Sequence, residues 1–433
     1  MNLLRPYQQR GAEFLAGKTR ALLADEMRLG KTPQAIVAAD AVMADDVLVL
    51  CPAIATGQWA REWQRWSGGY ARVLDGKGDI SCDDVVVASY DMARNRLDDL
   101  LARQWGVLII DEAHFARNPE AQRTKMVYGK GGLMWNAKYV WALSGTPAVK
   151  HAAELWPMMR AFGQTKAHYD DFVRAYCYCA EDGRILGTRA DKIEELREIL
   201  SRFMLRRKRL EVAPEMSAID FQFLHCTPDL SGMEALIKGQ YDAALEQVKA
   251  VAELLKGVPI EAQPSLLEEY AAHMSALRMY TACAKTTTIV EEVSAAMTAE
   301  LYTKTVVFGY HRVPLVLVRD GLRARGVKAE LIAGWTPQKE RERIINKFHN
   351  GGVDVVVANI LAAGTAIDLS AANHGYFLEL DWVPANNVQA ANRLVSMQKA
   401  VPVTFDVAVW PGSIDEKVQG ALVRRARELN QLL

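Results

Sequence analysis

Short apolar runs recur in the first third of the chain, and each is followed by a polar or turn-rich segment. The runs cover residues 20–23, 47–51, 84–89, 105–110 and 139–144. Their hydrophobicity is continuous rather than alternating, which is typical of strands covered on both faces of a parallel sheet. The pattern therefore predicts an α/β domain with a doubly wound parallel sheet.

The middle of the chain has a helical periodicity instead. Residues 236–256 and 265–283 carry apolar side chains at helical spacing and are rich in Ala, Leu, Glu and Gln, with Gly257, Pro259 and Pro264 as breaks. Strand-like runs return at residues 305–308, 329–332, 353–358, 376–380 and 404–409. A second sheet of the same class is expected there.

The last segment of the chain starts at Ser413, and Glu416 follows three residues later. This spacing resembles a helix-capping box and predicts one terminal helix. These patterns divide the chain into five segments. We expect a first α/β lobe at 1–147, a helical insertion with a return to that lobe at 148–225, a second helical insertion at 226–300, a second α/β lobe at 301–412 and a brace-like helix at 413–433.

Composition limits the class of protein. The chain has 433 residues, half of them hydrophobic, so it can bury more than one core. Its 52 basic residues balance 52 acidic ones, so a polyanion would need a local site, for which the basic run at 202–209 is the densest candidate. Six scattered cysteines, no secretory leader and no long apolar window predict a cytoplasmic protein with reduced thiols and no membrane span.

The first candidate for chemistry follows the strand at 20–23, where Gly30, Lys31 and Thr32 open a helix. In a phosphate-binding loop, backbone N–H groups and the helix N-terminus face the phosphates, the lysine reaches the β and γ oxygens, and the threonine hydroxyl can hold Mg²⁺. The first glycine of the usual motif falls on Asp25. On this loop alone, an ordinary helix start remains the alternative.

The second candidate is the pair Asp111 and Glu112, which follows the apolar strand at 105–110. The carboxyl ends of parallel strands face one ligand crevice, so Asp111 is expected to meet a Mg²⁺ bound near Lys31. Glu112 would orient and polarise an attacking water. An exposed acidic turn is the alternative interpretation.

Together these segments resemble the Swi/Snf-type DNA translocases of helicase superfamily two, near the annealing-helicase branch. Residues 25–34 match the family loop D-E-M-G-L-G-K-T-x-Q with Arg28 in place of Gly, residues 4–8 resemble the adenine-recognition segment, and residues 111–114 are the D-E-A-H box. Residues 143–147 are similar to the motif that couples nucleotide state to DNA binding. Residues 306–310, 363–369 and 389–393 resemble the fourth, fifth and sixth motifs in family order.

The resemblance implies two RecA-like parallel-sheet lobes with helical insertions, and a DNA-dependent ATPase that translocates on duplex or branched DNA regardless of sequence. Mg²⁺-ATP would be hydrolysed in the cleft between the lobes, with Lys31, Asp111, Glu112, Gln389 and Arg393 as catalytic residues and Thr32 and Asp111 as Mg²⁺ ligands. The ATP-binding residues would be Arg5, Gln8, Asp25, Met27, Arg28, Leu29, Gly30, Lys31, Thr32, Gln34, Gly364 and Asp368. The DNA-binding residues would be Pro52, Trp59, Ser89, Tyr90, Arg117, Asn118, Arg206, Arg207, Tyr310, His311, Trp335 and Thr365, and the coupling residues Ser144, Gly145 and Thr146.

One departure favours an alternative function. The second arginine of the sixth motif is Ser396 here. An arginine at the γ-phosphate accelerates related phosphoryl transfers by about 10³ to 10⁵. The alternative is therefore a nucleotide-gated DNA-binding module with weak ATPase activity. The short chain also leads us to expect a monomeric protein of bacterial or phage type.

Overall fold

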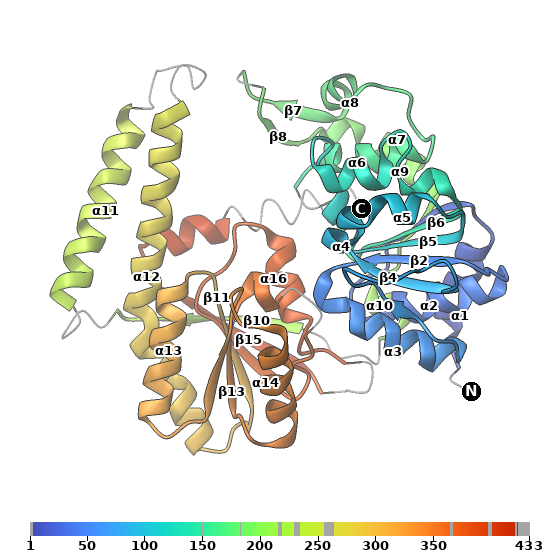
Figure 1. The fold of residues 1–433 in the computed structure, drawn as a ribbon. Helices are drawn as coiled ribbons and strands as arrows, with labels where there is room; N and C mark the ends of the chain where they lie inside the picture. The colour runs from blue at the N-terminus through green and yellow to red at the C-terminus, as the bar shows by residue number, and fades with distance from the viewer. Residues whose placement is uncertain are drawn as a thin grey trace. The chain divides into compact units, whose positions relative to one another are not determined.

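The computed structural model describes residues 3–148, 150–181, 183–214, 219–228, 234–254, 264–363, 367–396, 401–420 and 422. The chain folds as two compact units, one formed mainly by residues up to 215 and the other mainly by residues 216–426 (Figure 1). We call them the first lobe and the second lobe.

The first lobe contains a seven-stranded parallel sheet in the order β3-β4-β2-β5-β6-β1-β9. Its strands are β1 (Arg20–Leu23), β2 (Val47–Cys51), β3 (Arg72–Val73), β4 (Val85–Ser89), β5 (Trp105–Asp111), β6 (Ala137–Leu143) and β9 (Met204–Leu205). Fully buried side chains such as Leu22, Leu48, Leu108 and Val140 form its core. The predicted parallel sheet is confirmed, and the strands that the sequence did not predict, β3 and β9, are only two residues long.

Helices surround this sheet. They are α1 (Pro6–Ala16), α2 (Lys31–Ala41), α3 (Thr56–Ser67), α4 (Tyr90–Asn95), α5 (Leu97–Leu101), α6 (Gln122–Tyr128) and α10 (Arg209–Val212), with 3₁₀ turns η1 (Ala53–Ala55), η2 (Ala113–Ala116) and η3 (Leu133–Asn136). The first insertion contributes η4 (Ala152–Leu155), α7 (Trp156–Ala161), α8 (Tyr169–Tyr176), the antiparallel hairpin β7 (Cys177–Cys179) and β8 (Ile185–Thr188), η5 (Ala190–Lys192) and α9 (Ile193–Ser201).

The second lobe contains a six-stranded parallel sheet in the order β10-β15-β14-β11-β13-β12. Its strands are β10 (Ile219–His225), β11 (Thr305–Gly309), β12 (Ala329–Ile332), β13 (Val355–Asn359), β14 (His374–Phe377) and β15 (Val403–Val409). The expected segment 148–225 needs a correction at its end, because β10 pairs with β15 of the second lobe. This edge strand is largely exposed, so it lacks the continuous apolar pattern of the buried strands.

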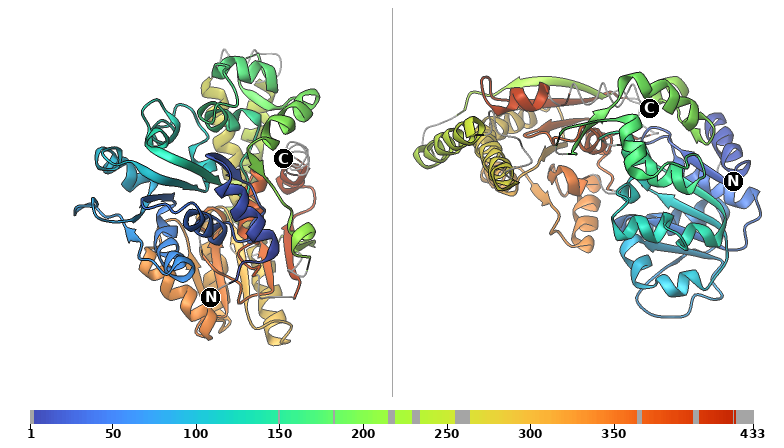
Figure 2. Two further views of the ribbon diagram at one scale, coloured as in Figure 1. Left: turned by 90° about the vertical axis from the view of Figure 1, so that its right-hand side faces the viewer. Right: turned by 90° about the horizontal axis from the view of Figure 1, so that it is seen from above.

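The second helical insertion forms two long helices, α11 (Glu234–Leu254) and α12 (Pro264–Thr298), which lie side by side in every view (Figures 1 and 2). The predicted helix at 265–283 is longer than expected because its end joins the lobe core. Val290 and Val293 of α12 pack with Val318 and Leu322 of α13 (Arg312–Ala324). A Cβ at Gly321 would lie 2.9 Å from Val290 Cγ2, so a glycine there permits the close approach of these helices.

The remaining helices of the second lobe are α14 (Gln338–Asn350), α15 (Ile360–Ala363) and α16 (Pro384–Ala391). Residues 414–420 are also helical, and we call them the terminal helix. Ile414 and Val418 of this helix pack against Ala244 of α11 and Leu277 of α12. The buried Lys285 Nζ of α12 also donates to Asp415 Oδ2 (2.8 Å) and to the Ala408 carbonyl (2.9 Å). None of the described helices has the length and apolar character needed to cross a membrane.

Candidate active site

The loop between β1 and α2 takes its shape from two left-handed residues. Gly30 precedes α2 with a φ of 74°, and Arg28 has a φ of 68°. Left-handed backbone favours glycine because a Cβ is disfavoured there. Arg28 therefore keeps the backbone conformation that the family glycine would adopt without strain.

Lys31 is the first residue of α2, and its side chain reaches back to this loop. Its Nζ donates to the Asp25 carbonyl (2.8 Å) and to the Glu26 carbonyl (3.3 Å). A Cβ at Gly145 would lie 3.4 Å from that Nζ, so the glycine after β6 leaves room beside the ammonium. Burial lowers the pKa of Lys31, although the charges of Glu112, Asp25 and Asp111 act in the opposite direction.

Two glutamine side chains stabilise the loop through hydrogen bonds. Gln8 Nε2 donates to the Leu29 carbonyl (3.1 Å), and Gln8 Oε1 accepts from the Arg5 main chain (2.9 Å). Gln34 Nε2 also donates to the Leu29 carbonyl (3.2 Å) and to Asp25 Oδ2 (3.1 Å). The residues of the first lobe predicted to bind ATP are therefore brought together at one loop, with Met27 and Thr32 half-buried beside them.

Arg207 takes a different position from the one expected. Its guanidinium donates through Nε to Asp25 Oδ1 (2.8 Å) and through Nη2 to Gln34 Oε1 (2.7 Å). Its Nη2 also donates to Asp25 Oδ2, so both carboxylate oxygens of the fully buried Asp25 accept from Arg207, which compensates the carboxylate charge. In this structure the side chain stabilises the loop, and a DNA contact of Arg207 stays a prediction.

The two carboxylates stand at the end of β5, as predicted. Asp111 Oδ2 accepts from Trp59 Nε1 (2.8 Å), and its Oδ1 accepts from the Glu112 main chain (3.0 Å). Burial and the neighbouring Glu112 charge raise the pKa of Asp111 to about 7. Glu112 Oε2 is buried and has no hydrogen-bond partner among the described residues.

Trp59 and Tyr90 support this carboxylate rather than a surface. Trp59 is 2 % exposed, and Tyr90 is 4 % exposed and donates through its hydroxyl to the Asp111 carbonyl (2.8 Å). A DNA contact needs an accessible side chain. Both side chains are buried against the β5 end, so their predicted DNA contacts stay predictions that this burial does not favour.

A histidine joins the carboxylates to the coupling motif. His114 Nδ1 lies 3.2 Å from Ser144 Oγ and 3.3 Å from Glu112 Oε2. Ser144 Oγ also accepts from the Thr146 main chain (3.2 Å). Burial, followed by the charge of Arg117, lowers the pKa of His114 to about 4, so the ring is neutral at neutral pH.

The other residues of this lobe expected at DNA lie near the carboxyl end of the sheet. Ser89 Oγ accepts from the Met92 main chain (3.1 Å) and caps α4, while Pro52 precedes η1 and is half-buried. Arg117 Nε lies 3.1 Å from Glu154 Oε1 of the first insertion. Asn118 is an exposed turn residue whose Oδ1 accepts from a main-chain N–H.

The first lobe has the donors that Mg²⁺ uses with ATP. Mg²⁺ is usually held by one or two protein ligands together with phosphates and waters. Asp111, the Thr32 hydroxyl at the start of α2 and the Glu112 oxygen that accepts no hydrogen bond among the described residues fit this requirement. A protein-only metal cluster of three or more His, Cys, Asp or Glu is absent from the described residues.

In the second lobe, Gln389 lies on α16 and Arg393 just after it. The Arg393 carbonyl accepts from the Leu369 main chain (3.0 Å), which joins the sixth motif to the end of the fifth. Asp368 is exposed and accepts from the Ser370 main chain (3.1 Å). Gly364 and Thr365 lie outside the described residues.

A buried carboxylate organises the fourth motif. Glu379 Oε2 accepts from the main chains of Tyr310 (3.2 Å) and His311 (2.9 Å), and its Oε1 lies 2.6 Å from His311 Nδ1. Burial would raise the pKa of Glu379, but the hydrogen bonds and charge of His311 lower it. His311 Nε2 also lies 3.1 Å from Ser275 Oγ, so α12 contacts this motif.

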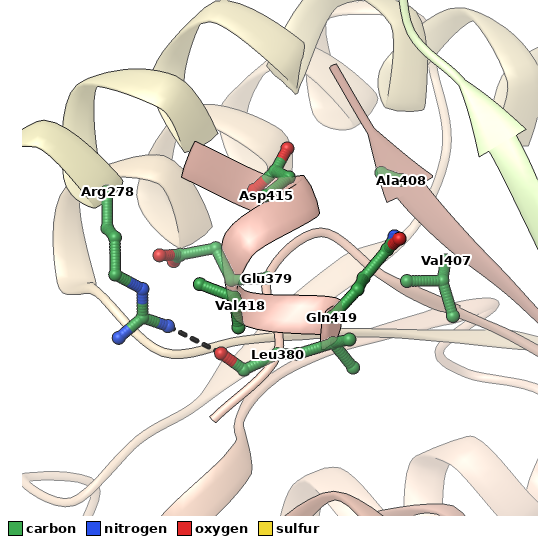
Figure 3. Close-up of a pocket in the computed structure, with 8 residues that line it drawn as sticks. All are labelled: Arg278, Glu379, Leu380, Val407, Ala408, Asp415, Val418 and Gln419. Atoms are coloured by element: carbon green, nitrogen blue, oxygen red, sulfur yellow. Dashed lines mark hydrogen bonds between the residues drawn. The ribbon is translucent and has the colours of Figure 1, made fainter. Parts of the chain in front are cut away.

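Arg278 of α12 lies beside the same carboxylate. Figure 3 shows Arg278, Glu379, Asp415 and Gln419 around one small pocket beneath the terminal helix. The Arg278 guanidinium also lies 5.2 Å from the ring centres of both Tyr310 and Trp382. By contrast Trp335, after β12, is 51 % exposed with Arg312 4.5 Å from its ring centre, so its ring is accessible for the predicted DNA contact.

Two protein-family models match this chain. The SNF2-related domain matches residues 7–237, and the helicase conserved C-terminal domain matches residues 285–398. The chain belongs to the SNF2-related family. Its fold is also similar to the Pyrococcus furiosus Hef helicase domain, with a TM-score of 0.55 and 17 % identity over 96 % of this chain and 97 % of that one.

Two curated SNF2-type relatives match nearly the whole chain. The SWI/SNF-related matrix-associated actin-dependent regulator of chromatin subfamily A-like protein 1 of Drosophila melanogaster is 28 % identical over 99 % of this chain and 56 % of its own length. The human DNA annealing helicase and endonuclease ZRANB3 is 25 % identical over 98 % of this chain and 40 % of its own length. The chain thus spans about half the length of these relatives, and their animal origin gives no support to the expected bacterial or phage source.

Sequence reasoning missed two features of this SNF2-type site. Glu379 follows an apolar strand just as Asp111 does, and that shared pattern could have identified it. Arg278 gave no such signal, because a single arginine in a helical stretch is indistinguishable from a surface residue without the fold.

Proposed function

We propose that this protein is a DNA-stimulated ATPase that translocates on duplex or branched DNA and hydrolyses Mg²⁺-ATP between its two lobes. One observation carries the proposal. The phosphate loop, the coupling motif and the carboxylate pair follow β1, β6 and β5, which are consecutive strands of one parallel sheet. Their carboxyl ends face the same crevice, which is where such sheets bind nucleotides.

Each residue has a defined part in this proposal. Lys31 binds the β and γ oxygens, Thr32 and Asp111 hold the metal, and Glu112 orients the attacking water. Bound Mg²⁺ would neutralise charge on the phosphates. Gln389 and Arg393 would reach the nucleotide from the second lobe, so that binding and hydrolysis change how the lobes close.

DNA would be held mainly through its phosphates, so binding should be independent of sequence and sensitive to salt. Pro52, Ser89, Arg117, Asn118, Tyr310, His311 and Trp335 are candidate contacts on described residues. The relatives named as annealing helicases support DNA as the partner. We expect a monomer to be sufficient for activity.

Phosphate release tests the function directly. We would measure it with no nucleic acid and with single strand, duplex, forked DNA or RNA. DNA should stimulate the wild-type rate, and Lys31→Ala and Glu112→Gln should abolish the stimulated rate. The exposed ion pair Lys125 and Glu120 supplies matched controls, since Lys125→Ala and Glu120→Gln should keep it. Hydrolysis that is absent or indifferent to DNA would refute the proposal.

Strand displacement on forked DNA separates translocation from unwinding. A translocase should hydrolyse ATP on a fork and displace little strand, whereas an unwinding helicase should release the strand in proportion to hydrolysis.

Ser396 favours a second candidate, a nucleotide-gated DNA-binding module with weak ATPase activity. That candidate predicts DNA affinity that changes with ATP while turnover stays low. Rapid DNA-stimulated turnover by the native chain would exclude it.

A further inference from the structure

We propose that Arg206 binds the phosphates of the nucleotide from the first lobe, and so belongs to the ATP site rather than to the DNA surface. The inference rests on the proposed ATPase function and names a residue that the phosphate-loop motif does not include. It also replaces the DNA contact that the sequence predicted for this residue.

The position of Arg206 follows from the edge of the sheet. β9 pairs with β1 in parallel, with Leu22 opposite Met204 and Leu23 opposite Leu205. Main-chain hydrogen bonds continue beyond the strands, from Ala24 N to Leu205 O (2.7 Å) and from Glu26 N to Arg207 O (3.1 Å). Arg206 therefore lies on an extended segment directly beside the start of the phosphate loop.

The two arginines of this segment differ in their surroundings. Successive side chains of an extended segment point to opposite sides. Arg207 points toward Asp25 and Gln34 at the base of the loop, where its guanidinium is fully engaged. Arg206 is the preceding residue of this segment, and its Nε and Nη1 make none of these hydrogen bonds.

Two of the three guanidinium nitrogens of the half-buried Arg206 are buried without an acceptor. Its Nε and Nη1 atoms are inaccessible and make no hydrogen bond with any residue in the described part of the chain. Nearby carboxylates are committed elsewhere: Glu26 Oε2 accepts from the Arg209 main chain (2.7 Å) and Glu211 Oε2 from the Lys208 main chain (3.2 Å). A buried cation without a partner is costly, and a missing anion is the physical explanation for such a group.

Electrostatics places that anion near Lys31. Burial lowers the pKa of Arg206 despite the opposing charges of Glu26, Asp25 and Glu211. The charge of Arg206 in turn contributes to the lowered pKa of Lys31, after the larger effect of burial. Two cations that repel each other beside a phosphate loop would both be stabilised by one polyphosphate.

The assignment bears on the sixth motif. If Arg206 contacts the phosphates, the first lobe contributes a cation to the site by itself. The loss of positive charge at Ser396 is then partly offset within this chain, and no arginine from a partner protein is needed to bind ATP.

Equilibrium binding of fluorescent ATP, ADP and AMP with Mg²⁺ tests the assignment. We expect Arg206→Met to weaken ATP binding by about tenfold or more, which is the loss typical of a charge-assisted hydrogen bond. AMP binding should change less than twofold, and Arg206→Lys should be intermediate. The control is Arg202→Met, because Arg202 is an exposed residue of the same basic run that pairs with Glu198.

Two further measurements keep the test decisive. DNA affinity without nucleotide, and its dependence on salt, should match the wild type, whereas a phosphate contact to DNA would reduce the salt slope by about one. The midpoint of thermal unfolding without nucleotide should be equal or higher in Arg206→Met, because removal of an unpartnered buried charge relieves a cost. A structural role would lower that midpoint.

The outcomes separate this inference from the function it rests on. If the wild type binds no ATP, the ATPase proposal fails and the inference fails with it. If the wild type binds ATP and Arg206→Met binds it equally well, or loses DNA affinity instead, only the assignment of Arg206 is overturned.

Discussion

At Arg28 the chain uses a non-glycine residue in left-handed backbone. The φ of 68° places a Cβ where it is disfavoured, and the residue lies between β1 and α2 in the phosphate loop. Strain of this kind persists only where surrounding contacts determine the backbone. The loop contacts of Gln8, Gln34 and Lys31 do so here.

Arg28→Gly should therefore stabilise the protein. We expect a gain of about 1 kcal/mol in the free energy of unfolding, the usual benefit of glycine in left-handed backbone. Denaturant unfolding followed by tryptophan fluorescence measures it. Met43→Gly is the control, since Met43 has a φ of 50° and is 84 % exposed just beyond α2. A loss of stability at Arg28 alone would show that contacts of its side chain outweigh the backbone strain.

His114 makes stability depend on pH. Its pKa falls to about 4 in the folded chain, from an ordinary value of 6.5. Between these pH values the unfolded chain binds the proton and the folded chain does not. The contribution of the neutral His114 to stability is therefore fully present above about pH 6.5 and is lost as the pH falls toward 4. The loss is at most about 3 kcal/mol, at about 1.4 kcal/mol for each pKa unit.

His114→Gln should flatten this dependence. We would measure the unfolding free energies of both proteins between about pH 7 and about pH 4 and compare how steeply each depends on pH, because the comparison removes the contribution of other acidic groups. Equal slopes would show that His114 does not titrate as its burial indicates.

At the scale of elements, the sequence predicts the strands that are buried on both faces of the sheet. β2, β4 and β5 were predicted because nearly all of their positions are apolar, and the strand ends then located Lys31, Asp111 and Glu112. The two-residue strand β9 gave no such pattern, although it positions Arg206. Short pairings of this kind depend on neighbours that are distant in the sequence.

Residue roles were harder to predict than elements. Trp59, Tyr90 and Arg207 lie in segments that resemble family motifs, yet all three turn inward to hold Asp111 or Asp25. The direction of a side chain depends on which strand or helix packs against it, and motif spacing does not contain that information.

The terminal helix depends on one buried ion pair. Lys285 is almost fully buried, and its Nζ donates to Asp415, which lines the pocket of Figure 3. Removal of one partner leaves a buried charge without compensation, which typically costs about 3–5 kcal/mol. Lys285→Met should therefore destabilise the second lobe strongly, as measured by denaturant unfolding.

The double variant Lys285→Met with Asp415→Leu tests the cause. Replacement of both charges by apolar groups should recover much of the lost stability. A double variant as unstable as the single one would show that packing rather than charge attaches the helix.

For the whole molecule, the proposed function requires residues of both lobes. The first lobe has the loop, the carboxylates and the neutral His114 link to Ser144, while the second has Arg393 after α16. The position of the second family arginine is Ser396, a half-buried residue. Turnover rather than binding is therefore the step that this departure should limit.

Ser396→Arg should raise the DNA-stimulated rate of ATP hydrolysis. A correctly placed arginine contributes up to about 10³ to 10⁵ in related systems, and a gain of about tenfold is expected here because Arg206 and Arg393 already supply charge. Lys31→Ala in the same background must abolish the gain, which excludes a contaminating ATPase. If the rate is unchanged while the native chain already turns over rapidly with DNA, Ser396 does not limit the chemistry. The weak-ATPase alternative is then excluded, because it predicts low turnover by the native chain.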